Sequence, residues 1–240
     1  MKKIVLKVLV VLLVAISLLG LPMLAGKIAD LIPNRSLDPD GAFWWISIHH
    51  IAQALLFVPL FLIVKLIFPK VDFKLRIGNV KQGFSYVWKF AVFFLVYTAI
   101  AYGITYFTDS FSVFRYPMRA NNILGYLGFQ LFLSGPSEEL IFRSFGIGVI
   151  ALLIPKRIFN NKISLATIIV AIIFALAHVG ISFSPFNLSY SLMQVFYAFG
   201  LGLVYGHCFE KTDSIIYPMM IHSISNVISV GVTILITFLI

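Results

Sequence analysis

Seven apolar runs, each close to or above the length of one bilayer crossing, constrain the fold of this chain more than any other feature. A helix needs about 20 mainly apolar residues to cross the hydrocarbon core of a membrane. Ordinary turn residues, such as Pro33-Asn34 and Pro155-Lys156, separate the runs. The runs are residues 4–25, 45–68, 85–107, 123–154, 163–179, 190–209 and 214–240. This pattern predicts an all-α fold, a polytopic bundle of transmembrane helices.

The number of spans depends on the two longest runs, 123–154 and 214–240. At about 1.5 Å per residue each exceeds one bilayer thickness, so each is expected to tilt, kink or divide. Gly135-Pro136 is the expected break in the first of them. We therefore predict seven or eight spans. Three of them lie in an N-terminal part, residues 1–122, and the others form a core of residues 123–240.

The composition excludes a separate soluble domain and argues against a nucleic-acid partner. Charged residues make up 11% of the chain, whereas soluble domains average about 25%. The net charge of +9 comes from small basic clusters between the apolar runs, which is how membrane proteins set their orientation. The single cysteine, Cys208, excludes an intramolecular disulfide framework and a cysteine-based zinc site.

The distribution of Lys and Arg predicts a cytoplasmic N-terminus. In that orientation thirteen basic residues face the cytosol and four face outside, in agreement with the positive-inside rule. An odd number of spans then puts the C-terminus outside, and an even number puts it inside with almost the same charge count. The thirteen are Lys2, Lys3, Lys7, Lys65, Lys70, Lys74, Arg76, Lys81, Lys89, Lys156, Arg157, Lys162 and Lys211, and the four are Lys27, Arg35, Arg115 and Arg119.

The longest cytosolic loop contains a strict apolar–polar alternation from Val71 to Ile77. In water such alternation indicates a half-buried strand. Beside a membrane it would also suit a short segment lying on the anionic inner leaflet. We interpret it as a plain loop whose charges set the orientation.

Three ionised residues, Glu138, Glu139 and Arg143, lie inside a predicted span away from its ends. Each costs roughly 2.5–3.5 kcal/mol at a helix centre unless it finds a partner. Glu139 and Arg143 are four residues apart with the acid first, the favourable order for an ion pair on a helix. Glu138 lies about 100° further round the helix and faces a different neighbour. We therefore expect Glu139 to be structural and Glu138 to be chemical.

Polar residues of two later runs are the expected neighbours of Glu138. His178 ends one run, and His222 and Asn226 share a face of the last run because they are four residues apart. Counted from the cytosolic ends at 1.5 Å per residue, these groups lie roughly within 12 Å of one depth. They are predicted to converge in one intramembrane pocket. The adjacent His49 and His50 have no acidic partner in the sequence, so we interpret them as packing residues.

Three short motifs in the C-terminal half, each within an apolar run, together resemble a known family. The motifs are Glu138-Glu139-x-x-x-Arg143, Phe174-x-x-x-His178 and His222-x-x-x-Asn226. They resemble the CPBP family, also called Abi, of CAAX prenyl endopeptidases and bacteriocin-processing or bacteriocin-immunity membrane proteins. The resemblance covers roughly residues 123–229. It departs from the family pattern at Ser144, where glycine often follows the arginine.

The resemblance implies an intramembrane endopeptidase that cleaves a peptide bond with an activated water. Glu138 would be the general base, and His178 would orient the water or share its proton. His222 and Asn226 would donate hydrogen bonds to the developing oxyanion. The supporting residues are Glu139, Arg143 and Phe174.

A zinc mechanism would use the same groups. Glu138, His178 and His222 are carboxylate and imidazole ligands of the kind that bind catalytic zinc and leave a fourth position open for water. The family is commonly classed as metallopeptidases, yet this sequence lacks the His-Glu-x-x-His helix. We favour the metal-free glutamate mechanism, which requires no cofactor, and keep zinc as the alternative.

Two other classes of function use the same residues differently. A non-catalytic immunity factor or scaffold could share the fold, although the intact set of four polar residues argues against it. A proton-coupled transporter would show repeated halves with interrupted helices, and the sequence shows none. The expected partners are the lipid bilayer and a peptide or lipidated-protein substrate. Phe- and Ile-rich usage favours a bacterial cell membrane, and the sequence leaves the substrate and the oligomeric state open.

Overall fold

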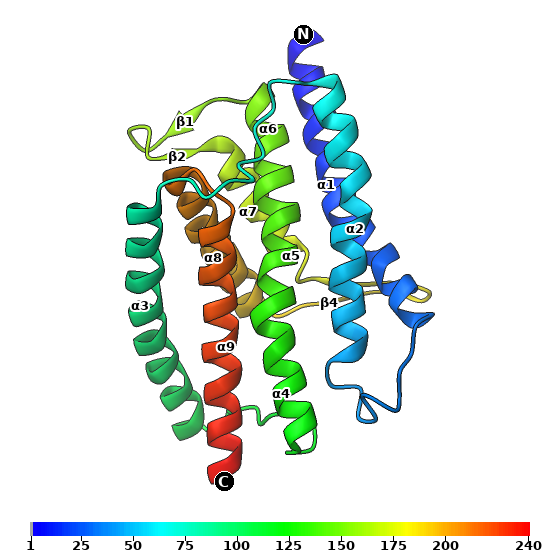
Figure 1. The fold of residues 1–240 in the computed structure, drawn as a ribbon, viewed down its shortest axis with the longest axis vertical. Coiled ribbons are helices and arrows are strands. Elements are labelled where there is room, and N and C mark those ends of the chain that lie inside the picture. Colours follow the sequence, from blue (N-terminus) through cyan, green and yellow to red (C-terminus); the bar gives the residue numbers. More distant parts are fainter. Residues whose placement is uncertain (1) are drawn as a thin grey trace.

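The computed structural model describes residues 2–240 as a bundle of roughly parallel and antiparallel helices (Figure 1). Two short β-hairpins, which the sequence did not predict, connect some of the helices. The helices are α1 Lys2–Asp30, α2 Trp44–Ile67, α3 Val80–Phe107, α4 Ala120–Phe129, α5 Gly135–Glu139, α6 Gly148–Leu153, α7 Leu165–Leu176, α8 Leu192–Thr212 and α9 Ile216–Leu239. The strands are β1 Arg157–Ile158, β2 Ile163–Ser164, β3 Gly180–Phe183 and β4 Phe186–Ser189, paired antiparallel as β1–β2 and β3–β4.

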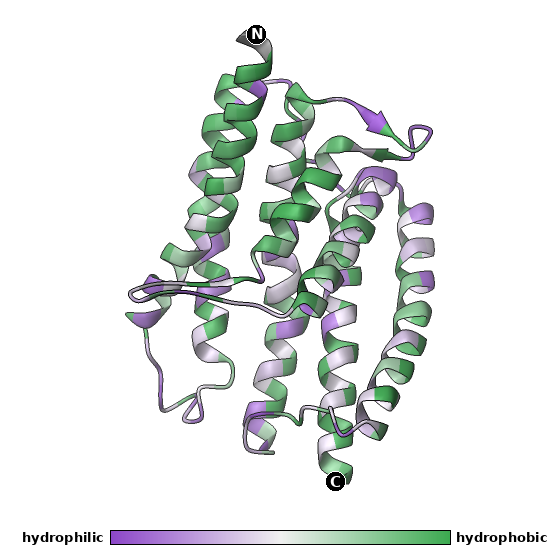
Figure 2. Ribbon diagram, turned by 180° about the vertical axis from the view of Figure 1, so that it is seen from behind, coloured by the Kyte–Doolittle hydropathy of each residue, from purple (hydrophilic) through white to green (hydrophobic). Residues whose placement is uncertain are grey.

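Five helices of the described chain, α1, α2, α3, α8 and α9, are long and apolar enough to cross a membrane. Many large apolar side chains of these helices are exposed. Hydrophilic residues concentrate near helix ends and in connections (Figure 2). The protein is therefore an integral membrane protein with an all-helical fold. The predicted count of seven or eight spans is not confirmed. Of the other two apolar runs, 123–154 forms a continuous helical rod that includes two π-helical segments, and 163–179 yields only the 12-residue helix α7.

The rod from α4 to α6 contains two π-helical segments, η1 Gln130–Ser134 and η2 Leu140–Ile147. The expected break at Gly135-Pro136 is absent, because Ser134 and Gly135 keep right-handed helical angles and the helix continues as α5. Pro136 has no N–H to donate to the preceding turn. The wider turn of η1 immediately before it accommodates that missing hydrogen bond. The rod therefore presents Glu138 and Glu139 on α5, between the two π segments.

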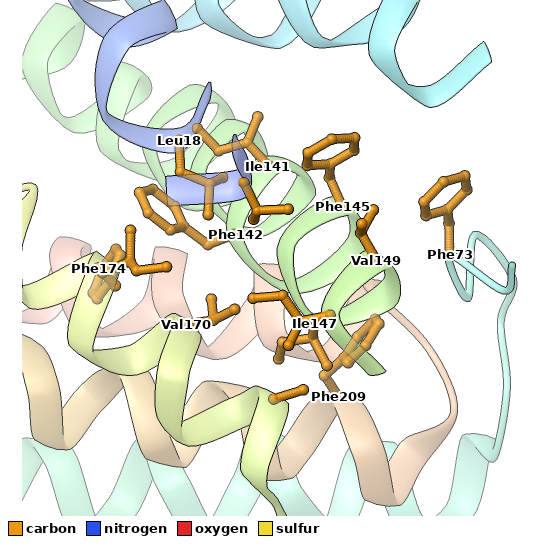
Figure 3. Packing of buried hydrophobic residues seen from close by; sticks show 14 of the residues in the cluster. Leu18, Phe73, Ile141, Phe142, Phe145, Ile147, Val149, Val170, Phe174 and Phe209 are labelled. Atoms are coloured by element: carbon orange, nitrogen blue, oxygen red, sulfur yellow. The ribbon is translucent and has the colours of Figure 1, made fainter. Parts of the chain in front are cut away.

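The hydrophobic core surrounds the upper part of this rod. Phe142 and Phe145 pack with Leu18 of α1 and with Val170 and Phe174 of α7 (Figure 3). Helix α8 lies close against α7, since a Cβ added at Gly206 would come within 2.5 Å of the Thr167 methyl group. The core thus fixes the rod against α1 and α7 at the level of the acidic residues.

The loop between α2 and α3 differs from the plain loop that we expected. Val71 and Phe73 are buried in the core, and residues 71–77 form no strand. The Ser144 hydroxyl donates a hydrogen bond to the Phe73 carbonyl at 2.6 Å. The alternation therefore reflects a loop segment that packs two apolar side chains into the core near the α6 end of the rod. Ser144, the departure from the family pattern, is the residue that ties the segment to the rod.

Candidate active site

Glu138 lies on α5 with its side chain 22% exposed, and two imidazoles face its carboxylate. His50 of α2 places Nε2 3.2 Å from Glu138 Oε1. His222 of α9 places Nε2 3.9 Å from Oε2, a distance too long for a direct hydrogen bond. Oε1 is therefore engaged in a hydrogen bond, whereas Oε2 has no hydrogen-bond partner among the described residues.

Glu139 is fully buried and contacts two groups, Arg143 and His222, whereas the sequence predicted only the first. Its Oε2 lies 3.1 Å from Arg143 Nε, which is the helical ion pair predicted from the sequence. Its Oε1 accepts a hydrogen bond from His222 Nδ1 at 2.8 Å. Glu139 therefore both neutralises Arg143 and orients the imidazole that faces Glu138. The second of these contacts was not predicted.

Arg143 is held mainly by aromatic rings. Its side chain is 0% exposed, and its guanidinium carbon lies 4.4 Å from the ring centroid of Phe174 and 5.4 Å from that of Tyr205. None of its nitrogens has a hydrogen-bond partner among the described residues, so the contact with Glu139 is an ion pair without hydrogen-bond alignment. Such desolvated cation–π contacts contribute about 2 kcal/mol each. Phe174 thus supports the site through Arg143.

Tyr205 is a site residue that the sequence analysis did not identify. Its ring stacks on His222 with centroids 4.7 Å apart and an interplanar angle of 23°. Its hydroxyl makes a hydrogen bond of 2.7 Å with Ser225. The tyrosine lies between Gly202 and Gly206 in a stretch whose small residues indicate helix packing, and nothing in that local pattern marks it as a partner of His222.

His178 follows the end of α7 and does not contact Glu138 directly in the described part of the chain. Its Nδ1 lies 2.8 Å from the Phe174 carbonyl oxygen, and its ring packs edge-on against Phe174 with centroids 5.0 Å apart. The Phe174 ring is in turn 6.1 Å from that of His222. His178 therefore joins the site through Phe174, with its Nε2 unengaged by these contacts.

Asn226 lies one turn beyond His222 on α9 and donates a hydrogen bond of 3.0 Å to the Ser134 hydroxyl. It also lines an open cavity of about 670 Å³ between α3, the start of α8 and α9. The cavity walls are rich in neutral hydrogen-bonding groups and contain no ionised side chain. They comprise Tyr97, Thr98, Ala101, Tyr102, Gln130, Ser191, Met193, Gln194, Tyr197, Asn226, Ser229 and Val230.

The contact between His50 and Glu138 contradicts the interpretation of His49 and His50 as packing residues without an acidic partner. The acidic partner exists, but it lies 88 residues further along the chain. His49 does behave as a packing residue, since its ring stacks on Trp45 with centroids 5.3 Å apart. Of the two adjacent histidines, only His50 belongs to the candidate active site.

The three residues considered for zinc do not converge as a ligand set. No group of three or more His, Cys, Asp and Glu side chains is arranged to hold a metal ion within residues 2–240. Glu138 contacts His50 and approaches His222, while His178 reaches neither.

The fold and the site define a class: a helical integral membrane protein with an acid–histidine–asparagine cluster inside the bundle. Residues 120–228 match the family described as type II CAAX prenyl endopeptidase Rce1-like. This segment of the chain is therefore similar to an Rce1-like domain, in agreement with the family resemblance of its three motifs. No curated protein and no solved structure matches the chain. Helices α1 to α3, and with them His50, lie outside the matched residues.

Proposed function

We propose that this chain is an intramembrane endopeptidase of the CAAX type, which hydrolyses a peptide bond in a peptide or a lipid-anchored protein. The family of its C-terminal domain supports a membrane protease. The observation that carries the proposal is the contrast between the two adjacent acids. Glu139 is buried between Arg143 and His222, whereas Glu138 is partly exposed and has one oxygen without a hydrogen-bond partner among the described residues.

In the proposed mechanism Glu138 takes a proton from a water molecule as the water oxygen attacks the scissile carbonyl carbon. A C–O bond forms, and the carbonyl oxygen becomes an oxyanion. The oxyanion is stabilised by a hydrogen bond from the Asn226 amide, because preorganised donors act strongly away from bulk water. His222 donates its Nδ1 proton to Glu139, so its neutral ring has a lone pair at Nε2 and accepts a hydrogen bond there. The C–N bond then breaks, and the proton held by Glu138 passes to the leaving amine. His178 orients the attacking water through its Nε2.

The substrate class follows from the cavity beside Asn226. Its amide and hydroxyl groups can pair with the N–H and C=O groups of an extended peptide, and its tyrosines can pack against apolar side chains or a lipid chain. The absence of ionised residues among its lining side chains suits a neutral peptide segment. We therefore propose that this cavity receives the substrate chain.

The proposed topology places the basic end of the bundle in the cytoplasm of a bacterial cell. The start of α1, the α2–α3 connection, the β1–β2 hairpin and the α8–α9 turn lie at one end, and the C-terminus lies at the other (Figure 1). Most Lys and Arg residues belong to the segments of that first end. In this topology the α4–α6 rod is a further span, and α7 enters the membrane from the same side without crossing it.

Cleavage by the purified protein tests the proposal. Wild type and Glu138→Gln are compared in detergent on a farnesylated CAAX peptide and on its unlipidated form, each with and without a zinc chelator. We expect a loss of kcat of at least about 100-fold in the variant, the size typical of a missing general base, at an unchanged melting temperature. Equal turnover by both proteins would refute the assignment of Glu138. A wild-type activity abolished by the chelator and restored by zinc would refute the metal-free mechanism.

A further inference from the structure

The contact between His50 and Glu138 brings a residue from outside the matched domain into the site. His50 is 6% exposed and its ring packs edge-on against Phe129 with centroids 4.8 Å apart. One turn further along α2, the Gln53 amide donates a hydrogen bond to the Ser137 hydroxyl. Helix α2 thus contacts two consecutive residues of α5, Ser137 and Glu138. These contacts set the position of the carboxylate relative to the bundle.

The hydrogen-bond partners of the His50 ring define which nitrogen carries the proton. Nδ1 lies 2.9 Å from the Ile46 carbonyl oxygen, which can only accept, so Nδ1 is a donor. In a neutral ring Nε2 then has a lone pair, and a lone pair facing a carboxylate oxygen at 3.2 Å would be repulsive. A hydrogen bond between His50 Nε2 and Glu138 Oε1 therefore requires one further proton, which the two atoms share.

The charges of the surrounding cluster favour this additional proton. Glu138 and Glu139 supply two carboxylates, and Arg143 supplies one permanent cation. The other groups that face the cluster, His222 and His178, are bound through Nδ1 to a carboxylate and a carbonyl oxygen. Uncompensated charge is costly in a site shielded from water. A proton between His50 and Glu138 makes the cluster neutral.

We infer that His50 is a positioning residue of the proposed hydrolysis: it holds Glu138 Oε1 through a hydrogen bond, so that Oε2 is the oxygen directed at the attacking water. The inference rests on the proposed function and extends the site to α2. Without this hydrogen bond the carboxylate can rotate about its side-chain torsions. A displacement of about 1 Å at a reacting group lowers the rate on the order of 100-fold.

Four substitutions at two adjacent positions test the inference with the same peptide substrate. His50→Phe keeps a planar ring that packs on Phe129 but removes the hydrogen bond, and His49→Phe is the matched control that keeps the stack on Trp45. His50→Gln places an amide N–H near the former Nε2 position. His50→Asn carries the same amide on a shorter side chain that does not reach Glu138.

We expect kcat to fall on the order of 100-fold in His50→Phe and His50→Asn, with KM within about twofold of wild type, because substrate contacts are unchanged. His50→Gln is expected to recover kcat to within about tenfold of wild type, and His49→Phe is expected to match wild type. If His50→Phe does not fold, the comparison of the Gln and Asn variants decides alone.

Equal kcat values for the Gln and Asn variants, or a change confined to KM, would overturn the inference. So would equal losses in His49→Phe and His50→Phe, since these would show a general packing effect of α2. If Glu138→Gln is inactive while every His50 variant is active, only the role of His50 fails. If cleavage does not depend on Glu138 at all, the proposed function fails and the inference with it.

Discussion

Replacing Arg143 with methionine would remove one partner of an ion pair that has no contact with solvent. Both side chains of the Glu139–Arg143 pair are 0% exposed, and their closest atoms are 3.1 Å apart. Removing one partner of a buried pair costs about 3–5 kcal/mol, because the other charge is left uncompensated. The cation–π contact of Arg143 with Phe174 adds about 2 kcal/mol. The hydrogen bond from His222 to Glu139 remains and offsets part of this. We expect a net loss of about 4 kcal/mol in the free energy of unfolding.

The assay is equilibrium unfolding in detergent micelles, with the single variants Arg143→Met and Glu139→Gln and the double variant. Because the double variant removes both charges, we expect it to be more stable than the sum of the single losses predicts, by about 2 kcal/mol. Arg76→Met is the matched control. Arg76 is exposed and pairs with Asp72 and Asp213, each at 2.6 Å. Its loss is expected to be far smaller, because water and salt screen exposed pairs.

Two results would refute this reasoning. One is an Arg143→Met variant no less stable than Arg76→Met, which would show that burial does not determine the strength of the pair. The other is strict additivity in the double variant, which would show that the two charges do not depend on each other. In either case the close approach of Glu139 and Arg143 would have no energetic role.

Two further predictions concern the α2–α3 loop and the wall of the site. Burial raises the pKa of Asp72, but hydrogen bonds from the loop backbone and from Arg76 outweigh it and hold the pKa below the usual 3.8. Asp72 therefore contributes stability that is present above its unfolded-state pKa and is lost as pH falls through the folded-state value. Asp72→Asn should lower the melting temperature at pH 7, and the difference from wild type should vanish in strong acid; a difference that persists there would contradict this origin. Tyr205→Phe keeps the stack on His222 and loses only the bond to Ser225, so its kcat should stay within about tenfold of wild type, whereas Tyr205→Leu should lose on the order of 100-fold. Equal kcat values for these two variants would show that the stacking does not orient the imidazole.

Contacts within one helix were predictable because helix geometry alone determines them. Glu139 and Arg143 are four residues apart, so their pairing follows from the sequence once the segment is known to be helical. The common face of His222 and Asn226 follows in the same way. The structure places both side chains against the rod, His222 beside the two glutamates and Asn226 beside Ser134.

The contacts that α2 makes with the site were not predictable from one sequence. His50 meets Glu138 only because α2 packs beside α5, and no local pattern encodes that neighbour or its register. Among the described residues His178 contacts Phe174, one turn earlier, and its predicted role at the attacking water stays a prediction. The alternation from Val71 to Ile77 did carry a signal of burial, but its apolar residues pack beneath a helix instead of within a sheet.

The two π-helical segments allow the rod to hold extra residues without changing the direction in which its two ends face. A π turn closes its hydrogen bonds over five residues where an α turn uses four. Deleting one residue from Gln130–Ser134 would let the segment relax into an ordinary α-helix with little rotation of the two ends of the rod, because the π turn and the α turn that replaces it close about the same angle. Asn226 meets the rod at Ser134, and His222 meets it at Glu139, just beyond η1. A single-residue deletion within η1 would therefore keep the acids facing α9, whereas deletion of Ser137 from α5 would rotate Glu138 and Glu139 by about 100° relative to Ser134 and turn them away from α9.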